Sequence, residues 1–346
     1  MATTIPSVPN SASQYQTMFM NQAGLYSGAE KLIPISLANG QSLWITGLQW
    51  SGSLTTGAAA RSTTSVHNIF SDILIQGNGI LRALQPTIFD STNTRYFMFD
   101  SASISNVHLA RLDPVCALAH GNTMIISCRY STTDFTDWTL PLGQLYAVFV
   151  NQNSTVSTNV TSVSQSYPMP VVTISSHTVY FGSSLLDLND GYLYMTGQTL
   201  VSGNYNHYLA RIPWAYIYDL THTQYYSGGG WTQNTNNATP MLTNVGPEIS
   251  LWRGAGKIFY VLAKMGSTNN TINLYSSSFI GQGYTVASVA ATATSPPSGG
   301  WSNGAYFVPG VQLASGKRLG FYSNGIANDT YDKANPQFKV PRFFEF

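Results

Sequence analysis

The chain has 346 residues, and its 15 basic and 14 acidic side chains leave a formal charge of +1 at pH 7. Charged residues make up only 8% of the chain, against about a quarter of an average soluble protein, whereas 43% of residues are hydrophobic and 13% aromatic. Disorder as the overall state is excluded, because it requires high net charge and few aromatic residues. Nucleic acid and membrane surfaces are unfavourable partners, since a nearly neutral chain generates no long-range attractive field.

The residue types that cover solvated helices are rare, with three Glu and six Lys in the whole chain, so we expect few helices. No apolar run reaches the roughly 18 residues of a membrane span, and residues 1–16 contain no visible signal peptide. Cys116 and Cys128 are too few for a disulfide scaffold or a zinc site. A turn at residues 121–122 would bring them near each other, and buried thiols are the favoured interpretation over a disulfide.

Short runs of β-branched and aromatic residues recur along the chain and end at Gly, Asn, Ser or Pro, which is typical of short antiparallel strands. Residues 1–34 are interpreted as an N-terminal arm, partly extended, whose Tyr15, Phe19, Met20 and Tyr26 could dock on the body or on another chain. The clearest predicted strands after the arm cover residues 42–49, 72–76, 94–99, 123–130, 145–151, 191–196, 257–265 and 318–323.

Tight turns precede several of these strands in the same way, at residues 39–40, 189–191, 254–256 and 315–316. Their spacing, in multiples of roughly 60 to 75 residues, indicates a degenerate repeat with one small antiparallel sheet per unit. Such sheets bury both faces only by stacking on their neighbours around an axis. We therefore predict an all-β fold, a five-bladed β-propeller over residues 35–346 with the extended N-terminal arm. A β-sandwich is the main alternative, and it would leave the repeat unexplained.

Residues 190–231, with the stretches DGYLYMTGQ, HYLARIPWAYIYD and QYYSGGGW, resemble the five-bladed propeller domains of bacteria and phages classed as domain-of-unknown-function family 4185. The stretches SLWITG, GPEISLWRGAGKIFYVLAKMG and AYFVPGVQLASGKRLGFYSNGIANDTYD extend the resemblance over residues from about 35 to 340. Some members of that family cleave arabinan, so the resemblance implies a carbohydrate-facing cleft at the axis and an Asp in the first blade. Leu48 occupies the position of that Asp, which places hydrolysis in doubt.

Glycoside cleavage uses two carboxylates that flank the scissile bond. The acidic residues considered for this role are Glu248, Asp72, Asp90 and Asp100. Glu248 is the strongest candidate, because it precedes a strongly apolar strand in a chain that is poor in Glu. Its alternative role is an ion pair with Arg253 or Arg211. Asp187 and Asp190 lie in turn-like contexts and are interpreted as turn caps.

Sugar rings pack on aromatic side chains while their hydroxyl groups pair with polar groups, so the weakly charged surface of a chain with 7 Trp and 21 Tyr suits neutral glycans. The residues predicted to bind glycan are Trp50, Arg211, Trp231, Trp252 and Tyr306. For each tryptophan the alternative is a core position between blades. The six histidines have no metal-ligand spacing, and we predict neither a metal nor another cofactor.

The sequence favours a virion-exposed propeller of the phage tail-fibre or minor-tail type, which binds glycan or acts structurally and has no hydrolase activity. An extracellular character without a visible signal peptide favours assembly into a particle, and hence a location outside the cell or on a virion. The expected partners are a surface glycan or other virion subunits, and a homo-oligomer is compatible with this role. The alternative is a glycoside hydrolase that acts on an arabinan-like cell-envelope polysaccharide, with Glu248, Asp72 and Asp100 as catalytic residues.

Overall fold

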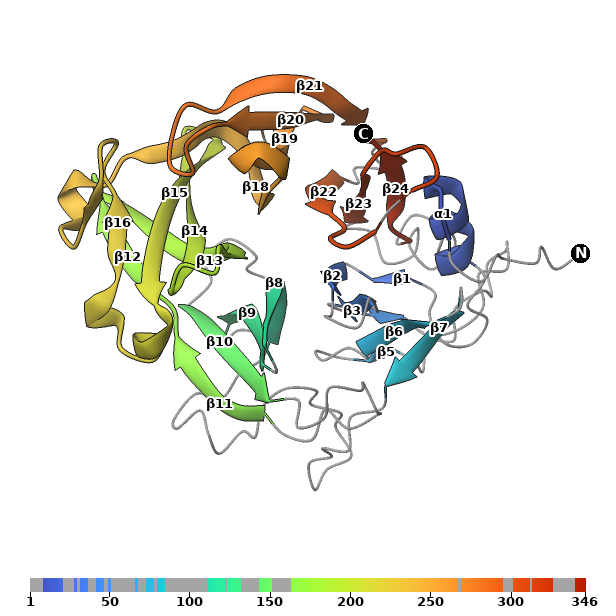
Figure 1. The fold of residues 1–346 in the computed structure, drawn as a ribbon, viewed down its shortest axis with the longest axis horizontal. Coiled ribbons are helices and arrows are strands. Elements are labelled where there is room, and N and C mark those ends of the chain that lie inside the picture. Colours follow the sequence, from blue (N-terminus) through green and yellow to red (C-terminus); the bar gives the residue numbers. More distant parts are fainter. Residues whose placement is uncertain are drawn as a thin grey trace, which may run out of the picture.

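The computed structural model describes residues 9–20, 28–29, 32–36, 42–46, 49–50, 66–67, 73–77, 80–84, 111–121, 123–131, 143–150, 163–266, 269–294, 301–311, 313–325 and 340–346. Most of them lie in strands, and every strand pairing within these ranges is antiparallel. Figure 1 shows the groups of strands arranged in chain order around a ring. No helix among these residues is long and apolar enough to span a bilayer.

Three sheets are formed by the first half of the chain. One has the strand order β2-β3-β6-β7, one has the order β11-β10-β9-β8, and a small one has the order β1-β4-β5. Their strands are β1 Gly28–Ala29, β2 Leu32–Ser36, β3 Ser42–Thr46, β4 Gln49–Trp50, β5 Val66–His67, β6 Ile73–Gly77, β7 Ile80–Leu84, β8 Arg111–His120, β9 Thr123–Ser131, β10 Gly143–Val150 and β11 Val163–Pro168.

A ten-stranded sheet occupies the next part of the ring. Its strands are β12 Val171–Ile174, β13 His177–Asp187, β14 Tyr192–Val201, β15 Asn204–Pro213, β16 Gln224–Tyr226, β17 Trp231–Thr232, β18 Pro240–Arg253, β19 Phe259–Met265, β20 Thr271–Ser277 and β21 Thr285–Thr292. The start of β18 pairs with β15, and its end pairs with β19, with the register shift between Val245 and Ile249. This long strand therefore joins two four-stranded meanders, β12 to β15 and β18 to β21. Short 3-10 helices connect some strands: η1 Trp214–Tyr216, η2 Leu220–His222, η3 Thr235–Asn237 and η4 Ala255–Lys257.

The last sheet contains β22 Trp301–Phe307, β23 Leu319–Gly325 and β24 Arg342–Glu345. One strand of each larger strand group faces the middle of the ring in Figure 1, and these inner strands contact one another in the order β2, β8, β13, β18 and β22. Sheets that are arranged radially, each with one edge strand at the centre and its faces against the neighbouring sheets, form a β-propeller. The predicted all-β propeller is confirmed, and its count of five blades stays a prediction.

Part of the predicted N-terminal arm is helical instead of extended. The helix α1 Ala12–Met20 starts where the Ser11 hydroxyl accepts a hydrogen bond from the Gln14 amide at 3.4 Å, as in the S-x-x-Q pattern of a helix start. Its side chains Tyr15 and Phe19 are buried in a core cluster with Trp44 of β3 and residues of the last sheet, which confirms docking on the body. Met20 is 37% exposed, and Tyr26 lies outside the described residues.

The other local predictions agree with the structure where it describes the residues. The predicted strands match β3, β6, β9, β10, β14, β19 and β23, and residues 94–99 lie outside the described part. The boundary expected between residues 34 and 35 falls inside β2, whose strand begins at Leu32. Cys116 and Cys128 lie on the paired strands β8 and β9 as thiols, with Cys128 fully buried and the Cys116 thiol donating to the Gly182 carbonyl at 3.0 Å.

Candidate functional site

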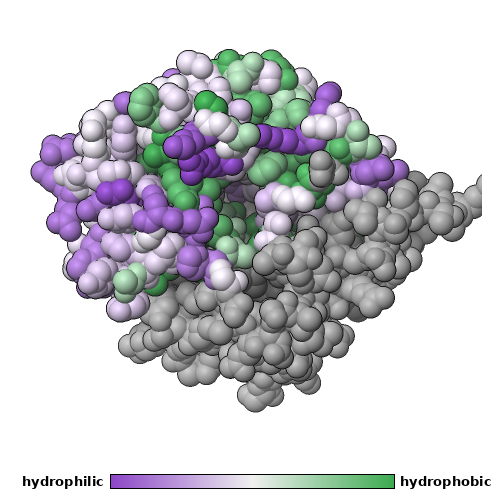
Figure 2. All heavy atoms as spheres, in the orientation of Figure 1, coloured by the Kyte–Doolittle hydropathy of each residue, from purple (hydrophilic) through white to green (hydrophobic). Residues whose placement is uncertain are grey.

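A pocket of about 460 Å³ lies where three turns meet, and each of these turns follows an inner strand, β13, β18 or β22. We call it the turn pocket. It is lined by residues 186–189, residues 252–254, Phe307, Pro309, Gly310 and Arg318. Its volume falls within the range of small-molecule sites. Figure 2 shows a hollow near the middle of the ring that is bordered by both hydrophobic and hydrophilic residues.

One wall of the turn pocket is built from stacked aromatic rings and an arginine. Trp252 at the end of β18 stacks on Phe307, with ring centroids 4.3 Å apart, and on Tyr260, with centroids 5.6 Å apart. The guanidinium carbon of Arg318 lies 4.7 Å from the Tyr260 ring centroid and 5.4 Å from that of Trp252, within cation–π range. Gly254 leaves the space for this stack, since a methyl group there would lie 2.6 Å from Tyr260 and 3.1 Å from Arg318 Nη2.

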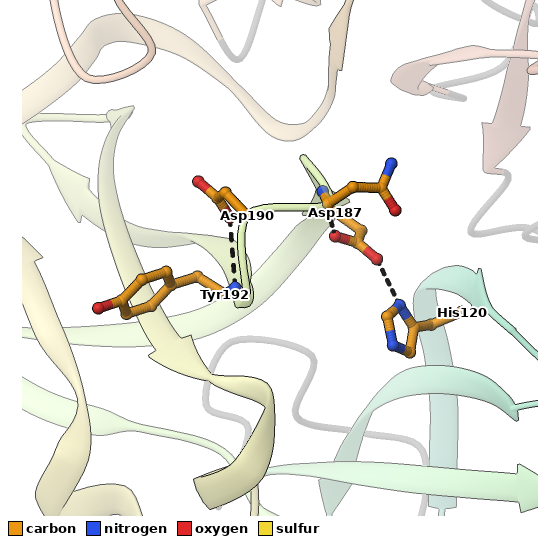
Figure 3. A network of polar contacts seen from close by, with 5 residues as sticks. His120, Asp187, Asp190 and Tyr192 are labelled. Carbon is orange, nitrogen blue, oxygen red and sulfur yellow. Dashed lines mark hydrogen bonds and ion pairs between the residues drawn. The ribbon is translucent and has the colours of Figure 1, made fainter.

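The opposite wall carries a carboxylate that is already engaged. Asp187 ends β13, and its Oδ1 accepts a hydrogen bond from the Asn189 amide at 2.7 Å. Its Oδ2 pairs with Nδ1 of His120, at the end of β8 in the neighbouring sheet (Figure 3). The His120 ring stacks on Trp214 with centroids 3.9 Å apart. Asp190 accepts from the Tyr192 amide at 3.2 Å, so the expectation that Asp187 and Asp190 cap the turn is confirmed.

Glu248 and Tyr306, both singled out by sequence, meet between the inner strands β18 and β22. The Glu248 side chain is buried, and its Oε2 accepts a hydrogen bond from the Tyr306 hydroxyl. Tyr306 stacks on Phe321 with ring centroids 5.0 Å apart, which holds the hydroxyl in place. Glu248 is not among the residues that line the turn pocket. This contact therefore joins two neighbouring strand groups beside the ring's centre.

The predicted alternative partners of Glu248 have other contacts. In the part of the chain that the structure describes, neither Arg211 nor Arg253 forms an ion pair with Glu248. The other predicted catalytic residues, Asp72 and Asp100, lie outside the described residues, as do Asp90 and Leu48. Of the carboxylates predicted to act in a hydrolase, Glu248 alone lies among the described residues.

Arg211 and Trp231 lie together on the meander of β14, β15 and the short strands that follow. The guanidinium carbon of Arg211 is 4.1 Å from the ring centroid of Tyr192 and 4.3 Å from that of Trp231, and its Nε donates to Gln224 Oε1 at 2.9 Å. Tyr194 contacts Trp231 edge-on, and burial raises the pKa of its hydroxyl to about 12. These groups pack on one another away from the turn pocket. The side chain of Trp50 lies outside the described residues.

A buried lysine lies near the same boundary between strand groups as Glu248. Lys264 of β19 is 4% exposed, and its Nζ donates to the Ser302 carbonyl of β22 at 2.9 Å. Burial lowers the pKa of this ammonium group. Together with the Glu248–Tyr306 contact and the bonds of the Ser250 hydroxyl to Ala305 and Phe307, this bond ties the last sheet to the ten-stranded sheet.

Comparison with known proteins places the chain in a family. A profile described as "Domain of unknown function (DUF4185)" matches residues 143–327, which is more than half of the chain. The chain belongs to the DUF4185 family. A search of curated proteins finds no significant match. The resemblance inferred from sequence is thus confirmed at the level of the family, and the phage context stays a prediction.

Comparison with solved structures gives likenesses at low sequence identity. A protein of Bacteroides ovatus, provisionally assigned as a hydrolase, has a TM-score of 0.67 at 13% identity, covering 96% of this chain and 88% of that one. The GH43 protein BlXynB of Bacillus licheniformis has a TM-score of 0.46 at 13% identity, covering 90% and 51%. A sialidase of Trypanosoma rangeli has a TM-score of 0.45 at 12% identity, covering 86% and 44%. At 13% identity, the first of these likenesses shows a shared fold.

The sequence identifies Trp252 as a candidate for the pocket but assigns none of the charged pocket residues to ligand binding. It predicts Asp187 only as a turn cap and Arg253 only as a partner of Glu248, and it selects neither Arg318 nor His120 as a site residue. Part of the signal existed, because the predicted turns at residues 189–191 and 254–256 include the pocket residues Asn189 and Gly254. The pocket turn after β22, at Pro309 and Gly310, is not among the predicted turns. In a propeller, the turns that follow successive inner strands gather at one end of the axis, so the residues that flank these turns are candidate site residues.

Proposed function

We propose that this DUF4185 protein is a carbohydrate-binding β-propeller that holds a sugar unit in the turn pocket and does not hydrolyse it. The single observation that carries the proposal is the pocket itself, with an aromatic wall, two arginines and a carboxylate wall in about 460 Å³. Apolar sugar faces pack on aromatic side chains, and hydroxyl groups pair with polar groups at fixed positions. Phe307 supplies apolar surface, while Asp187 and Asn189 supply polar atoms opposite it.

The charge distribution of the pocket favours binding over cleavage. Asp187 is the only carboxylate among the residues described at the pocket, whereas glycoside hydrolysis usually employs two carboxylates about 5 to 10 Å apart. The Asp187 carboxylate already accepts from the Asn189 amide and pairs with His120. A carboxylate with both oxygens engaged is poorly suited to protonate a leaving group or to attack a sugar carbon.

We further propose that the protein works outside the cell or on a virion surface, where it binds a surface glycan or another virion subunit. The support is the composition: 8% charged residues and a formal charge of +1, with many Ser, Thr, Asn and Tyr. Such a surface recognises neutral and weakly charged polymers through hydrogen bonds and aromatic contacts instead of long-range attraction.

The test is direct binding to a panel of purified polysaccharides, combined with an assay for reducing ends. We expect saturable binding to at least one polysaccharide, no release of reducing sugar from arabinan, and weaker binding by the Phe307→Ala variant. Leu200→Ala is the control, because Leu200 is 55% exposed and lies on β14 away from the pocket. Absence of binding to every polysaccharide, or equal losses in the two variants, would refute the proposed site.

A glycoside hydrolase is the second candidate, and the observation that favours it is the buried Glu248 carboxylate with its Tyr306 contact beside the ring's centre. A buried carboxyl group of this kind suits a general acid. This hypothesis predicts release of reducing sugar that Glu248→Gln abolishes while polysaccharide binding persists. Cleavage that survives Glu248→Gln would eliminate Glu248 as the acid.

A further inference from the structure

The two arginines of the turn pocket have hydrogen-bonding capacity that nothing in the described structure uses. The guanidinium of Arg318 is half-buried against the Tyr260 and Trp252 rings. Arg253, at the end of β18, is exposed, with its guanidinium carbon 6.0 Å from the Phe259 ring centroid. Among the described residues, neither guanidinium forms a hydrogen bond or an ion pair. Both side chains nevertheless line the same pocket.

Ring contacts leave the binding edge of a guanidinium available. The aromatic rings interact with its flat face, whereas its five N–H groups point outward in the plane and match the two oxygens of a carboxylate or the oxygens of a sulfate or phosphate. The contacts of Arg318 with Tyr260 and Trp252 also restrict its rotamers, so less entropy is lost when a ligand binds. An arginine that is held by its face and lacks a partner at its edge is pre-organised for an anion.

The charges around the pocket also favour an anionic ligand. Arg253, Lys257 and Arg318 lie in or beside the turns after β18 and β22, which places three of the 15 basic residues here in a chain whose formal charge is only +1. The neighbouring Lys317 faces the Glu345 carboxylate. The carboxylate on the opposite wall, Asp187, is engaged by His120. The arginine wall is therefore a local concentration of positive charge that lacks a carboxylate partner among the described residues, and it attracts an anionic group at short range.

We propose that the turn pocket selects an acidic sugar, whose anionic group is bound by the N–H edges of Arg253 and Arg318 while the sugar ring packs on the aromatic wall. This inference rests on the proposed carbohydrate-binding function and specifies its ligand class. The anionic group can be the carboxylate of a uronic acid, a sulfate ester or a phosphate ester, because all three offer paired oxygens to the arginines.

The experiment compares matched sugars. Glucuronate and galacturonate, the 6-sulfates and 6-phosphates of glucose and galactose, and the two parent hexoses are titrated into the protein, and binding is followed by the indole N–H signals in nuclear magnetic resonance. We expect at least one acidic sugar to bind tenfold or more tightly than its parent, and the identity of that sugar distinguishes the carboxylate, sulfate and phosphate sources. Added salt is expected to weaken this binding, because an exposed arginine contributes to it.

The variants separate a specific site from general charge. Arg253→Gln and Arg318→Gln should each remove most of the preference for the acidic sugar and leave the affinity for its parent within about twofold. Lys257→Gln is the matched control, since it removes the same charge from the same turn without lining the pocket. Arg253 is exposed, so its variant keeps the test valid even if Arg318→Gln perturbs the ring stack.

Failure of the anion site and failure of carbohydrate binding give different results. Equal binding of acidic and neutral sugars, or a loss in Lys257→Gln as large as in Arg253→Gln, overturns the anion site while carbohydrate binding stands. Absence of binding by every sugar, together with absence of binding to polysaccharides, overturns both proposals.

Discussion

Replacement of Gly304 by alanine tests the contact between the inner strands β18 and β22. A Cβ atom at Gly304 would overlap the Cβ of Glu248 and would lie 2.7 Å from its carbonyl oxygen and 3.0 Å from its Cα. Carbon atoms that are not bonded make their best contacts at roughly 3.5 to 4 Å. Two of the three clashing atoms belong to the backbone of a buried strand, so they cannot rotate away as a flexible side chain would.

The expected cost follows from what must move. Overpacking of a well-packed interior costs roughly 1 to 3 kcal/mol and occasionally more. Separation of the two strands would also strain the hydrogen bond between the Tyr306 hydroxyl and the Glu248 carboxyl group, and a buried polar group that loses its hydrogen bond costs about 1 to 3 kcal/mol. We therefore expect Gly304→Ala to lower the free energy of unfolding by about 2 to 6 kcal/mol, a large fraction of the roughly 5 to 15 kcal/mol of a folded domain.

The assay is urea unfolding followed by tryptophan fluorescence. If the free energy of unfolding falls by about 3 kcal/mol per molar urea, the upper end of the usual range, the unfolding midpoint should drop by about 0.7 to 2 M. Gly230→Ala is the matched control, because a Cβ there meets no atom within 4 Å. The control should be neutral or slightly stabilising, by up to about 1 kcal/mol. If Gly304→Ala has the same midpoint as Gly230→Ala, the inner strands do not pack as described.

Three further predictions concern the turn pocket, the helix α1 and the buried side chain of Tyr225. Gly254→Ala should displace the Tyr260 ring and the Arg318 guanidinium stacked on it, weakening acidic-sugar binding several-fold in the same titration. Glu345→Ala removes the acceptor of the Ala12 amide at the start of α1, and calorimetry should show a loss of about 1 kcal/mol. Burial raises the pKa of Tyr225 to about 12, so stability should fall as the pH rises from about 10, where unfolded tyrosine ionises, through 12. Tyr225→Phe should reduce this alkaline loss when unfolding is measured against pH.

Local features of the chain determined much of its secondary structure. Alternating apolar residues and tight turns predict strands at residues 123–130 and 191–196 and a turn at residues 189–191, because strand pleating and turn geometry depend on neighbours a few positions apart. The helix at residues 12–20 was missed, although the pattern from Ser11 to Gln14 is a start signal. The helix buries Tyr15, Met18 and Phe19 on one short face. So few apolar residues in so short a stretch are equally compatible with an extended segment that docks on the body.

The candidate site forms only where strand groups that are distant in the sequence come together around the ring. Glu248 and Tyr306 are 58 positions apart and His120 and Asp187 are 67 positions apart, and each pair joins neighbouring strand groups. The sequence by itself determined the strands, the turns and the aromatic, weakly charged composition. Only the tertiary structure decided which turns meet, because the stacking of sheets around an axis depends on contacts between distant segments that no local pattern encodes. That arrangement brought Arg318 to the same pocket as Asp187 and left Arg211 packed elsewhere.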